Sequence, residues 1–348
     1  MSDTVTIKFK PKQVTKNLLS VLSDRGKEVI IRRYGLGDKI EKMTLESIGK
    51  KYGITRERVR QIENHSIAQI KKSKEFAKEK PTFDQLKDYL DSLGGIVSEE
   101  DILNHISKDQ SIRNHIHFFM VIEDRFTKEK EDADFKHRWH VDKELANKIH
   151  LSLKKLYNSL GDDELVLEGD LINSFLEYIK DISDKYKRDE ILRRWLSLSK
   201  KISKNPLGEW GKTQSPNVSA KGMRDYAFLV IRKHGSPIHF REVAKAISQY
   251  FNKKAHVATT HNELIKDPRF VLVGRGLYAL TEWGYLSGVV KDVIKKIIEK
   301  NGPLPKDKII EKVLKERYVK ENTIVVNLQN PQYFRRDREN KYHIAEAK

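Results

Sequence analysis

Four polar side chains near the N-terminus have the chemistry needed to read base pairs. They are Arg56, Glu57, Arg60 and Gln61. An arginine can donate two hydrogen bonds to O6 and N7 of guanine, a glutamine can pair with N6 and N7 of adenine, and a glutamate can accept from the amino group of cytosine. On a helix these positions, together with Asn64, form one polar stripe. They are the candidate base-reading residues of the chain.

Two short helices joined by a tight turn are expected to position this stripe. In the first helix, Leu45, Ile48 and Tyr52 recur at the spacing of one apolar face. Gly53 can take the left-handed conformation that ends a helix, and Thr55 is a suitable N-cap for the second helix. A charged stripe alone would indicate a solvated face with ordinary salt bridges. The helix-turn-helix spacing favours a helix that enters the major groove of DNA.

Residues from about Leu18 to Ser73 resemble region 4 of bacterial housekeeping sigma factors, and the run TRERVRQIE is the most specific part of the match. In that family the second helix reads the upstream promoter hexamer, and the domain docks on the flap tip of the RNA polymerase β subunit. The resemblance implies base contacts by Arg56, Glu57, Arg60 and Gln61. It also implies phosphate contacts, which we assign to Thr44, Lys51, Thr55 and Arg58.

Two departures from the sigma pattern change what the resemblance implies. The acidic residues usual near the start of the first helix are replaced by Asp24, Arg25, Gly26 and Lys27. We therefore expect docking on polymerase to differ in detail. Fewer than twenty residues precede the match, which leaves no room for the sigma domains that melt the promoter. The sequence predicts a protein other than a complete sigma factor.

The composition indicates a polyanionic partner. Lys and Arg outnumber Asp and Glu by 68 to 50 in 348 residues, a formal net charge of +18, and double-stranded DNA is the partner that suits such a surplus. No apolar run approaches the roughly eighteen residues of a membrane-spanning helix, and the N-terminus lacks the apolar core of a signal peptide. The absence of cysteine excludes disulfides and thiol catalysis. We expect a bacterial cytoplasmic, nucleoid-associated protein with no membrane partner.

Charge is distributed unevenly along the chain. Basic residues outnumber acidic residues by 20 to 10 in residues 1–80, by 11 to 5 in 221–285 and by 15 to 9 in 286–348. Residues 146–220 are nearly balanced, whereas residues 81–145 hold 9 basic and 15 acidic side chains. Because phosphate repels an acidic surface, residues 81–145 are expected to contact protein, or nothing, in preference to DNA.

The pattern of apolar residues predicts a mainly α fold. An N-terminal helix-turn-helix is followed by about four winged-helix-like units with short β wings. The predicted segments are a flexible arm at 1–13, the helix-turn-helix domain at 14–80, and winged-helix-like units at 81–145, 146–220 (which ends in a linker), 221–285 and 286–348. Helices are expected at about 14–22 and 24–34, with a β-like run at 5–9 in the arm. The second helix of the helix-turn-helix, called the reader helix because it carries the candidate base-reading residues, is expected to continue to Pro81.

A second resemblance covers residues 223–285. The runs AFLVIRKHGSPIHFREVAKAI, DPRFV and GRGLYALTEWG are similar to the HARE helix-turn-helix domain. This winged-helix module occurs in the delta subunit of bacterial RNA polymerase, in chromatin proteins and in some restriction enzymes. The expected core residues are Phe240, Val243, Ile247, Leu264, Phe270, Tyr278 and Trp283. The phosphate candidates are Lys253, Lys254, His256, His261, Arg269 and Arg275, and a solvated basic face is the alternative.

The arginines near the C-terminus are a further set of phosphate candidates. Arg335, Arg336 and Arg338 fall where the wing of the last unit should turn. Wing arginines can enter the minor groove of DNA, although an exposed charge cluster on a hairpin is equally ordinary.

No motif predicts an enzyme. The sequence has no Walker loop, no GxGxxG after a strand, no HExxH and no GxSxG. His115 and His117 point apart on a helix, and neither that pair nor His137 with His140 has an acidic ligand at a fixed spacing. No segment is left over to house a nuclease core. We expect no catalytic residue, no metal, no cofactor and no small-molecule substrate.

These features predict a sequence-specific DNA-binding transcription factor of sigma region 4 type. It would recognise promoter-like duplex DNA and contact the RNA polymerase core at the β flap. One alternative is a delta-like accessory subunit of polymerase that uses the same domains mainly to dock on protein. Another is a nucleoid protein without sequence preference, which would leave the polar stripe unexplained.

Overall fold

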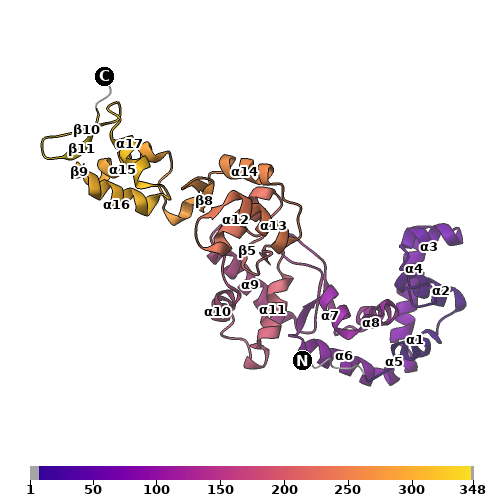
Figure 1. Ribbon diagram of the computed structural model, residues 1–348. Helices are drawn as coiled ribbons and strands as arrows, with labels where there is room; N and C mark the ends of the chain where they lie inside the picture. The colour runs from indigo at the N-terminus through magenta and orange to yellow at the C-terminus, as the bar shows by residue number, and fades with distance from the viewer. Residues whose placement is uncertain (1–7, 346–348) are drawn as a thin grey trace. The chain divides into compact units, whose positions relative to one another are not determined.

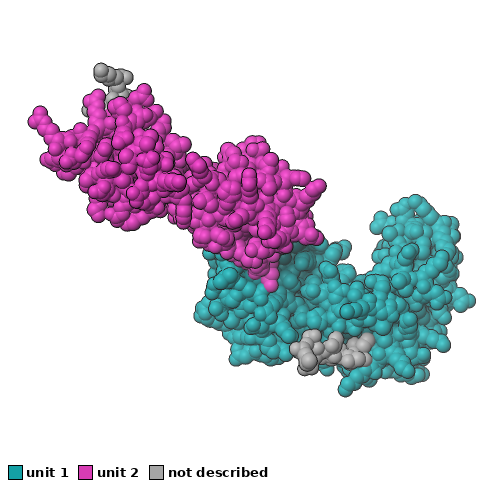
Figure 2. Space-filling view, in the orientation of Figure 1, with its two compact units in different colours: residues 1–203, 210–213 teal, residues 204–209, 214–348 magenta. Residues whose placement is uncertain are grey.

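The computed structural model describes residues 8–345, which fold into seventeen α-helices and several small antiparallel sheets (Figure 1). The chain divides into two compact units (Figure 2). The first unit holds residues 1–203 and 210–213, and the second holds residues 204–209 and 214–348. No helix among residues 8–345 is long and apolar enough to cross a membrane. The predicted mainly α fold with short strands is confirmed.

Four helices form the N-terminal part of the first unit. They are α1 (Pro11–Leu19), α2 (Asp24–Tyr34), α3 (Leu45–Tyr52) and α4 (Arg56–Lys71). Helix α1 begins three residues earlier than predicted, because a proline suits the first turn of a helix, where its missing N–H is not needed. The end of the predicted arm is therefore helical. Most of the β-like run at 5–9 lies outside the described residues, and Phe9 packs near the Phe119 ring.

The reader helix ends earlier than predicted. Helix α4 stops at Lys71, and two further helices follow, α5 (Lys74–Lys78) and α6 (Lys80–Ser92). The Ser73 hydroxyl accepts a hydrogen bond from the backbone N–H of Phe76, so Ser73 caps a new helix. Pro81 lies in the first turn of α6. The predicted continuous helix to Pro81 is wrong because this local cap restarts the helix.

The rest of the first unit contains two runs with a similar order of elements. The first run comprises α6, β1 (Ile96–Ser98), α7 (Glu99–Ile106), α8 (Gln110–Ile122), β2 (Thr127–Glu129) and β3 (Arg138–His140). Its sheet has the order β1-β3-β2. The second run comprises α9 (Lys143–Ser159), α10 (Glu168–Tyr178), η1 (Asp184–Tyr186), α11 (Asp189–Leu198), β4 (Ile202–Lys204) and β5 (Trp210–Lys212). In the second run, an isolated antiparallel β-bridge between Val166 and Trp210 replaces the strand that follows the first helix of the other run.

The second unit repeats the order helix, strand, helix, helix, strand, strand twice. One run comprises α12 (Met223–His234), β6 (Ile238–His239), α13 (Phe240–Phe251), α14 (Val257–Lys266), β7 (Phe270–Leu272) and β8 (Leu277–Leu280), followed by η2 (Thr281–Trp283). The other comprises α15 (Val290–Asn301), β9 (Leu304–Pro305), α16 (Lys306–Glu316), α17 (Glu321–Leu328), β10 (Phe334–Arg336) and β11 (Lys341–Ile344). Their sheets have the orders β6-β8-β7 and β10-β11-β9.

One hydrophobic core joins the N-terminal helices to the acidic run that follows them. Leu18 of α1 and Ile30 of α2 are fully buried in the same cluster as Phe118 and Phe119 of α8. The amide nitrogen of the buried Asn114 side chain donates to the backbone oxygens of Gly35 and Ile40, at 3.0 and 2.8 Å. The acidic residues 81–145 therefore contact protein within the same chain.

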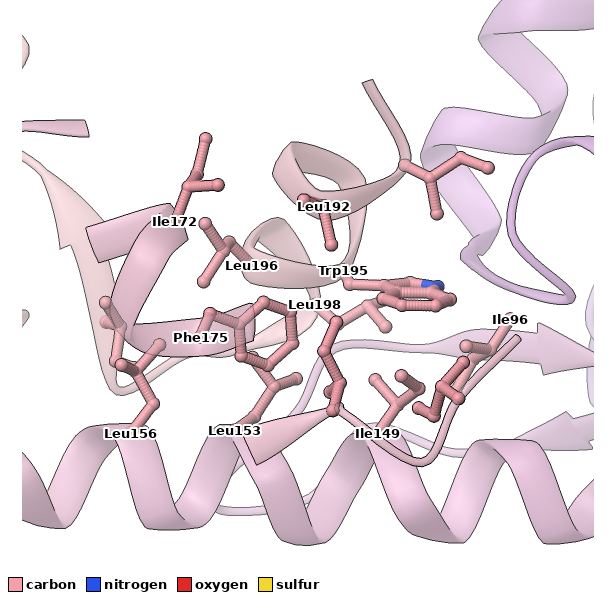
Figure 3. Close-up of a cluster of buried hydrophobic side chains, with 14 of the residues drawn as sticks. Ile96, Ile149, Leu153, Leu156, Ile172, Phe175, Leu192, Trp195, Leu196 and Leu198 are labelled. Carbon is pink, nitrogen blue, oxygen red and sulfur yellow. The ribbon is translucent and has the colours of Figure 1, made fainter. Parts of the chain in front are cut away.

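A second core lies between β1 and helices α9, α10 and α11 (Figure 3). Trp195 projects from α11 toward Ile96, and its indole Nε1 donates to the backbone oxygen of Gly94 at 3.1 Å. Phe175 and Leu153 pack beside Trp195. Because each core uses residues from neighbouring runs, the first unit is held together by shared burial of apolar surface.

Candidate nucleic-acid interface

The exposed face of α4 carries all four predicted base-reading residues. Arg56, Glu57, Arg60 and Gln61 are each exposed. The opposite side of the helix is buried through Val59, Glu63, Ser66 and Ile70. The structure thus brings the predicted residues together on one surface, as the helical spacing requires.

Two hydrogen-bonded pairs order the side chains on this face. Arg60 donates from Nε and Nη2 to the two carboxylate oxygens of Glu57, at 2.8 and 2.7 Å. The hydrogen bond from Arg60 is the main cause that lowers the pKa of Glu57. Arg58 donates from Nη1 to Oε1 of Gln61 at 3.1 Å. Each pair uses only part of the donors of its arginine, so both guanidinium groups keep N–H donors for a ligand.

The two threonines predicted as phosphate contacts cap the helices of the motif. Thr44 Oγ1 accepts from the backbone N–H of Ser47, and Thr55 Oγ1 accepts from that of Arg58, both at 3.1 Å. Both residues are exposed, and each hydroxyl keeps its own proton for donation. A phosphate group at the start of α4 would also meet the positive end of the helix dipole.

Close backbone packing sets the angle between α3 and α4. A Cβ atom added at Gly49 would lie 2.6 Å from the backbone oxygen of Ile54, so a side chain at position 49 would force the helices apart. Gly53 has the left-handed φ of 65° that was expected for the turn. Ile48 and Val59 are fully buried between the helices.

Contacts to α2 hold the buried side of α4. The Tyr34 hydroxyl donates to Oε1 of Glu63 at 2.9 Å, and Nε of Arg33 lies 3.4 Å from the same oxygen. Only 8% of Glu63 is exposed, so these partners compensate for burying a carboxylate. Burial, together with the negative charge of Glu63, raises the pKa of Tyr34. Contacts between α2 and the buried side of α4 therefore fix the position of the helix that carries the recognition face.

Comparison with known proteins identifies this region. Residues 18–72 match the family model described as Sigma-70, region 4. They form a sigma-70 region 4 domain. The match covers a small part of the chain, so the family of the whole protein does not follow from it.

Similar segments occur in three bacterial sigma factors. RNA polymerase principal sigma factor HrdD of Streptomyces griseus is 45% identical over 56 residues, which cover 16% of this chain and 17% of that protein. RNA polymerase sigma factor RpoS of Coxiella burnetii is 49% identical over 53 residues, 15% of each chain. RNA polymerase sigma factor RpoD of Helicobacter pylori is 46% identical over 56 residues, 16% of this chain and 8% of that protein. The chain thus spans less than a fifth of these relatives.

A groove of about 620 Å³ runs along one flank of the region 4 domain, between the start of α2 and α4. Arg25 lines one wall, and Arg58 and His65 line the other. Sequence reasoning did not select Arg25 or His65 as binding residues. His65 follows Arg58 by seven positions, a helical spacing that could have revealed it. Arg25 could not be placed there from local sequence.

Of the other predicted phosphate residues, Lys51 is exposed on α3, and five more are exposed in the second unit. Lys253 and Lys254 follow α13, Arg275 lies between β7 and β8, and Arg335 and Arg336 lie on β10. Nζ of Lys253 stands 6.0 Å from the centre of the Tyr226 ring. Within their own unit these side chains are available to a polyanion.

The interpretation of Arg269 as a phosphate contact is wrong. Its Nη2 lies 2.7 Å from Asp267 and 3.0 Å from Asp225, and 24% of its side chain is exposed. The charge is already neutralised by two carboxylates, so Arg269 ties α12 to the segment that precedes β7. His261 stacks on the Phe240 ring at a centroid distance of 4.1 Å. That contact occupies one face of the imidazole.

Proposed function

We propose that the protein is a DNA-binding transcription factor that reads promoter-like duplex DNA through α4. The observation that carries this proposal is the exposed set of Arg56, Glu57, Arg60 and Gln61 on α4, the second helix of the helix-turn-helix in a sigma-70 region 4 domain. Their donors and acceptors suit the base edges of the major groove. The activity is binding and recruitment, without a chemical step, cofactor or metal.

Phosphate contacts would orient α4 on the duplex. Thr44 caps α3, Lys51 lies in its last turn, and Thr55 and Arg58 lie at the start of α4. Arg25 shares a groove with Arg58 and would add to these contacts. Each neutralised phosphate releases condensed counterions, so affinity should fall steeply as salt rises. These contacts would set the register, and the four base-reading residues would supply sequence preference.

RNA polymerase core is the protein partner in this proposal. The similar proteins are named as RNA polymerase sigma factors, and the region 4 resemblance suggests the β flap as the docking site. We further propose that residues 223–285 form a HARE-type winged helix. The order α12, β6, α13, α14, β7, β8 supports that assignment. Such a factor would act at the nucleoid in the bacterial cytoplasm.

Selection of bound duplexes from a random pool tests the proposal. Purified full-length protein is used alone and with polymerase core added, at moderate salt. A motif similar to the upstream promoter hexamer is expected, and it should disappear in the Arg60→Ala, Gln61→Ala double variant. Lys108→Ala, an exposed change in the acidic run, serves as the control and should keep the motif. Recovery of unrelated sequences by the wild-type protein under both conditions would refute sequence reading.

A second candidate is an accessory subunit that uses the second unit to dock on polymerase. Val257 and Ile265 of α14 and Val326 of α17 are exposed, and neither helix contains arginine. Exposed apolar side chains on helices without arginine suit a protein partner better than phosphate. Stable binding to polymerase core without any selected DNA motif, lost on Val326→Asp but kept in Arg60→Ala, would favour this candidate.

A further inference from the structure

The β10–β11 hairpin presents three arginines on a firmly anchored wing. Phe334 at its base is 3% exposed and packs in the core of the last run. The strands pair in register, with Arg335 opposite His343 and Arg336 opposite Tyr342. Arg338 lies in the turn between them. All three arginines are exposed, so a fixed backbone holds three positive charges in solvent.

The carboxylates of this hairpin are engaged by other side chains. Asp337 lies 2.7 Å from Nε2 of His343, and Glu339 lies 2.9 Å from Nζ of Lys341. The Asp337 carboxylate also accepts from the backbone N–H of Lys341 at 2.8 Å. Across residues 8–345, no carboxylate oxygen comes within 4.0 Å of the three guanidinium groups. Three neighbouring arginines that form no ion pair within residues 8–345 suit an anionic ligand.

The helix that precedes the wing lacks the chemistry of a base reader. Helix α17 has the sequence ENTIVVNL, with no lysine or arginine, and 58% of Val326 is exposed. A reading helix needs donors that reach base edges, above all arginine for guanine. Helix α17 therefore offers no lysine or arginine to a nucleic acid, whereas the wing offers three arginines.

We propose that the β10–β11 wing binds the phosphate backbone of duplex DNA without reading sequence. Successive residues of a strand project to opposite faces, so Arg335 and Arg336 point to the two sides of the hairpin, with Arg338 at its tip. A thin hairpin charged on both sides matches the two phosphate strands that line a minor groove. A flat acidic protein surface would contact only one side of the hairpin and would leave the arginine on the other side unused. This contact goes beyond α4 and does not depend on it.

The salt dependence of binding tests the wing directly. Full-length protein is titrated with a fluorescent duplex of random sequence over a range of NaCl concentrations. Each phosphate contact contributes about 0.9 to the slope of log affinity against log salt. The Arg335→Ala, Arg336→Ala, Arg338→Ala triple variant should therefore have a slope smaller by about 2 to 3, with affinity at low salt reduced about tenfold or more. A variant with lysine in place of all three arginines keeps the positive charge and should keep most of the slope.

A matched variant separates the wing from net charge. Lys108, Lys143 and Lys155 are exposed lysines of the first unit, and changing all three to alanine removes the same charge. An equal loss of slope in this control and in the arginine variant would overturn the proposal. So would an unchanged slope in the arginine variant, whether or not it lost binding to polymerase core. The α4 double variant should lose sequence preference and keep most of the salt slope, so failure of base reading and failure of the wing are distinguishable.

Discussion

The carboxylate of Glu57 accepts two hydrogen bonds from one edge of the Arg60 guanidinium on the exposed face of α4. The two hydrogen bonds, from Nε and Nη2, are 2.8 and 2.7 Å long. Both side chains are about half exposed, at 56% and 52%, so the pair contributes little to stability. The hydrogen bonds to Glu57 leave Nη1 and one N–H of Nη2 unused. Glu57 therefore holds the edge formed by Nη1 and Nη2 in position to meet a base. Such an arrangement lowers the conformational entropy lost on binding.

Removal of Arg60 should relax sequence preference. We expect Arg60→Ala to cost about 1–3 kcal/mol on the preferred duplex, with a smaller loss on duplexes altered at the base that Arg60 contacts. Arg60→Lys should fail to restore the preference, because lysine lacks the planar fork. Competition binding between the preferred and altered duplexes measures the difference. Equal losses on all sequences would show that Arg60 contacts phosphate instead.

Removal of the Tyr34 hydroxyl should loosen the buried side of α4. Tyr34→Phe deletes the 2.9 Å hydrogen bond to Glu63 and leaves that carboxylate with Arg33 at 3.4 Å. The free energy of unfolding should fall by about 1–3 kcal/mol, the usual cost when a buried group loses its partner. Urea unfolding measures this change. A stability equal to that of wild type would mean that water replaces the hydroxyl at no cost.

The core shared by α8 and the region 4 domain should make their unfolding cooperative. Phe118 is fully buried, and its ring centre lies 5.1 Å from that of Tyr34. Phe118→Ala should lower stability by about 3–5 kcal/mol, and binding through α4 should be lost together with the structure of α8. Leu151→Ala, which changes a side chain that is 60% exposed, should alter stability by no more than about 0.5 kcal/mol.

Hydrogen exchange followed by mass spectrometry checks that cooperativity. In the Phe118→Ala variant, protection should decrease in α2, α4 and α8 together. Full protection of α4 beside an unprotected α8 would show that the region 4 domain folds independently of the acidic run.

The first unit should lose stability as the pH falls below neutrality. Burial, aided by the positive charge of Lys42, lowers the pKa of His117 from 6.5 to about 4, although Glu99 nearby opposes the shift. Between those values the unfolded chain binds a proton that the folded chain does not bind. This contribution is complete above pH 6.5 and is lost as the pH falls toward 4. Burial also lowers the pKa of His150 to about 4, which acts in the same direction.

Urea midpoints measured at intervals from pH 7.5 to 4.5 test this dependence. The midpoint should fall steadily below pH 6.5, and His117→Asn should flatten part of the fall. A midpoint that stays constant between pH 6.5 and 5 would mean that the buried imidazoles accept protons without penalty.

The sequence by itself determined the region 4 motif and the mainly α fold. The stripe on α4, the caps Thr44 and Thr55 and the turn at Gly53 were all predictable, because each depends on residues within one or two helical turns. Hydrogen bonds to the backbone three residues away and a repeat of 3.6 residues are encoded in short windows. Ser73 was the exception among local signals, since an apolar pattern that continues past a cap conceals the break.

Only the tertiary structure decided which charges are available and which apolar faces are covered. Arg269 and Lys253 look alike in sequence, yet Arg269 is neutralised in part by Asp225, 44 residues away. Arg25 joins Arg58 in one groove only because α2 packs against α4. The apolar residues of α8 predict burial but not that α1 and α2 bury them. Long-range pairing depends on how the helices pack, and no short window of sequence specifies that packing.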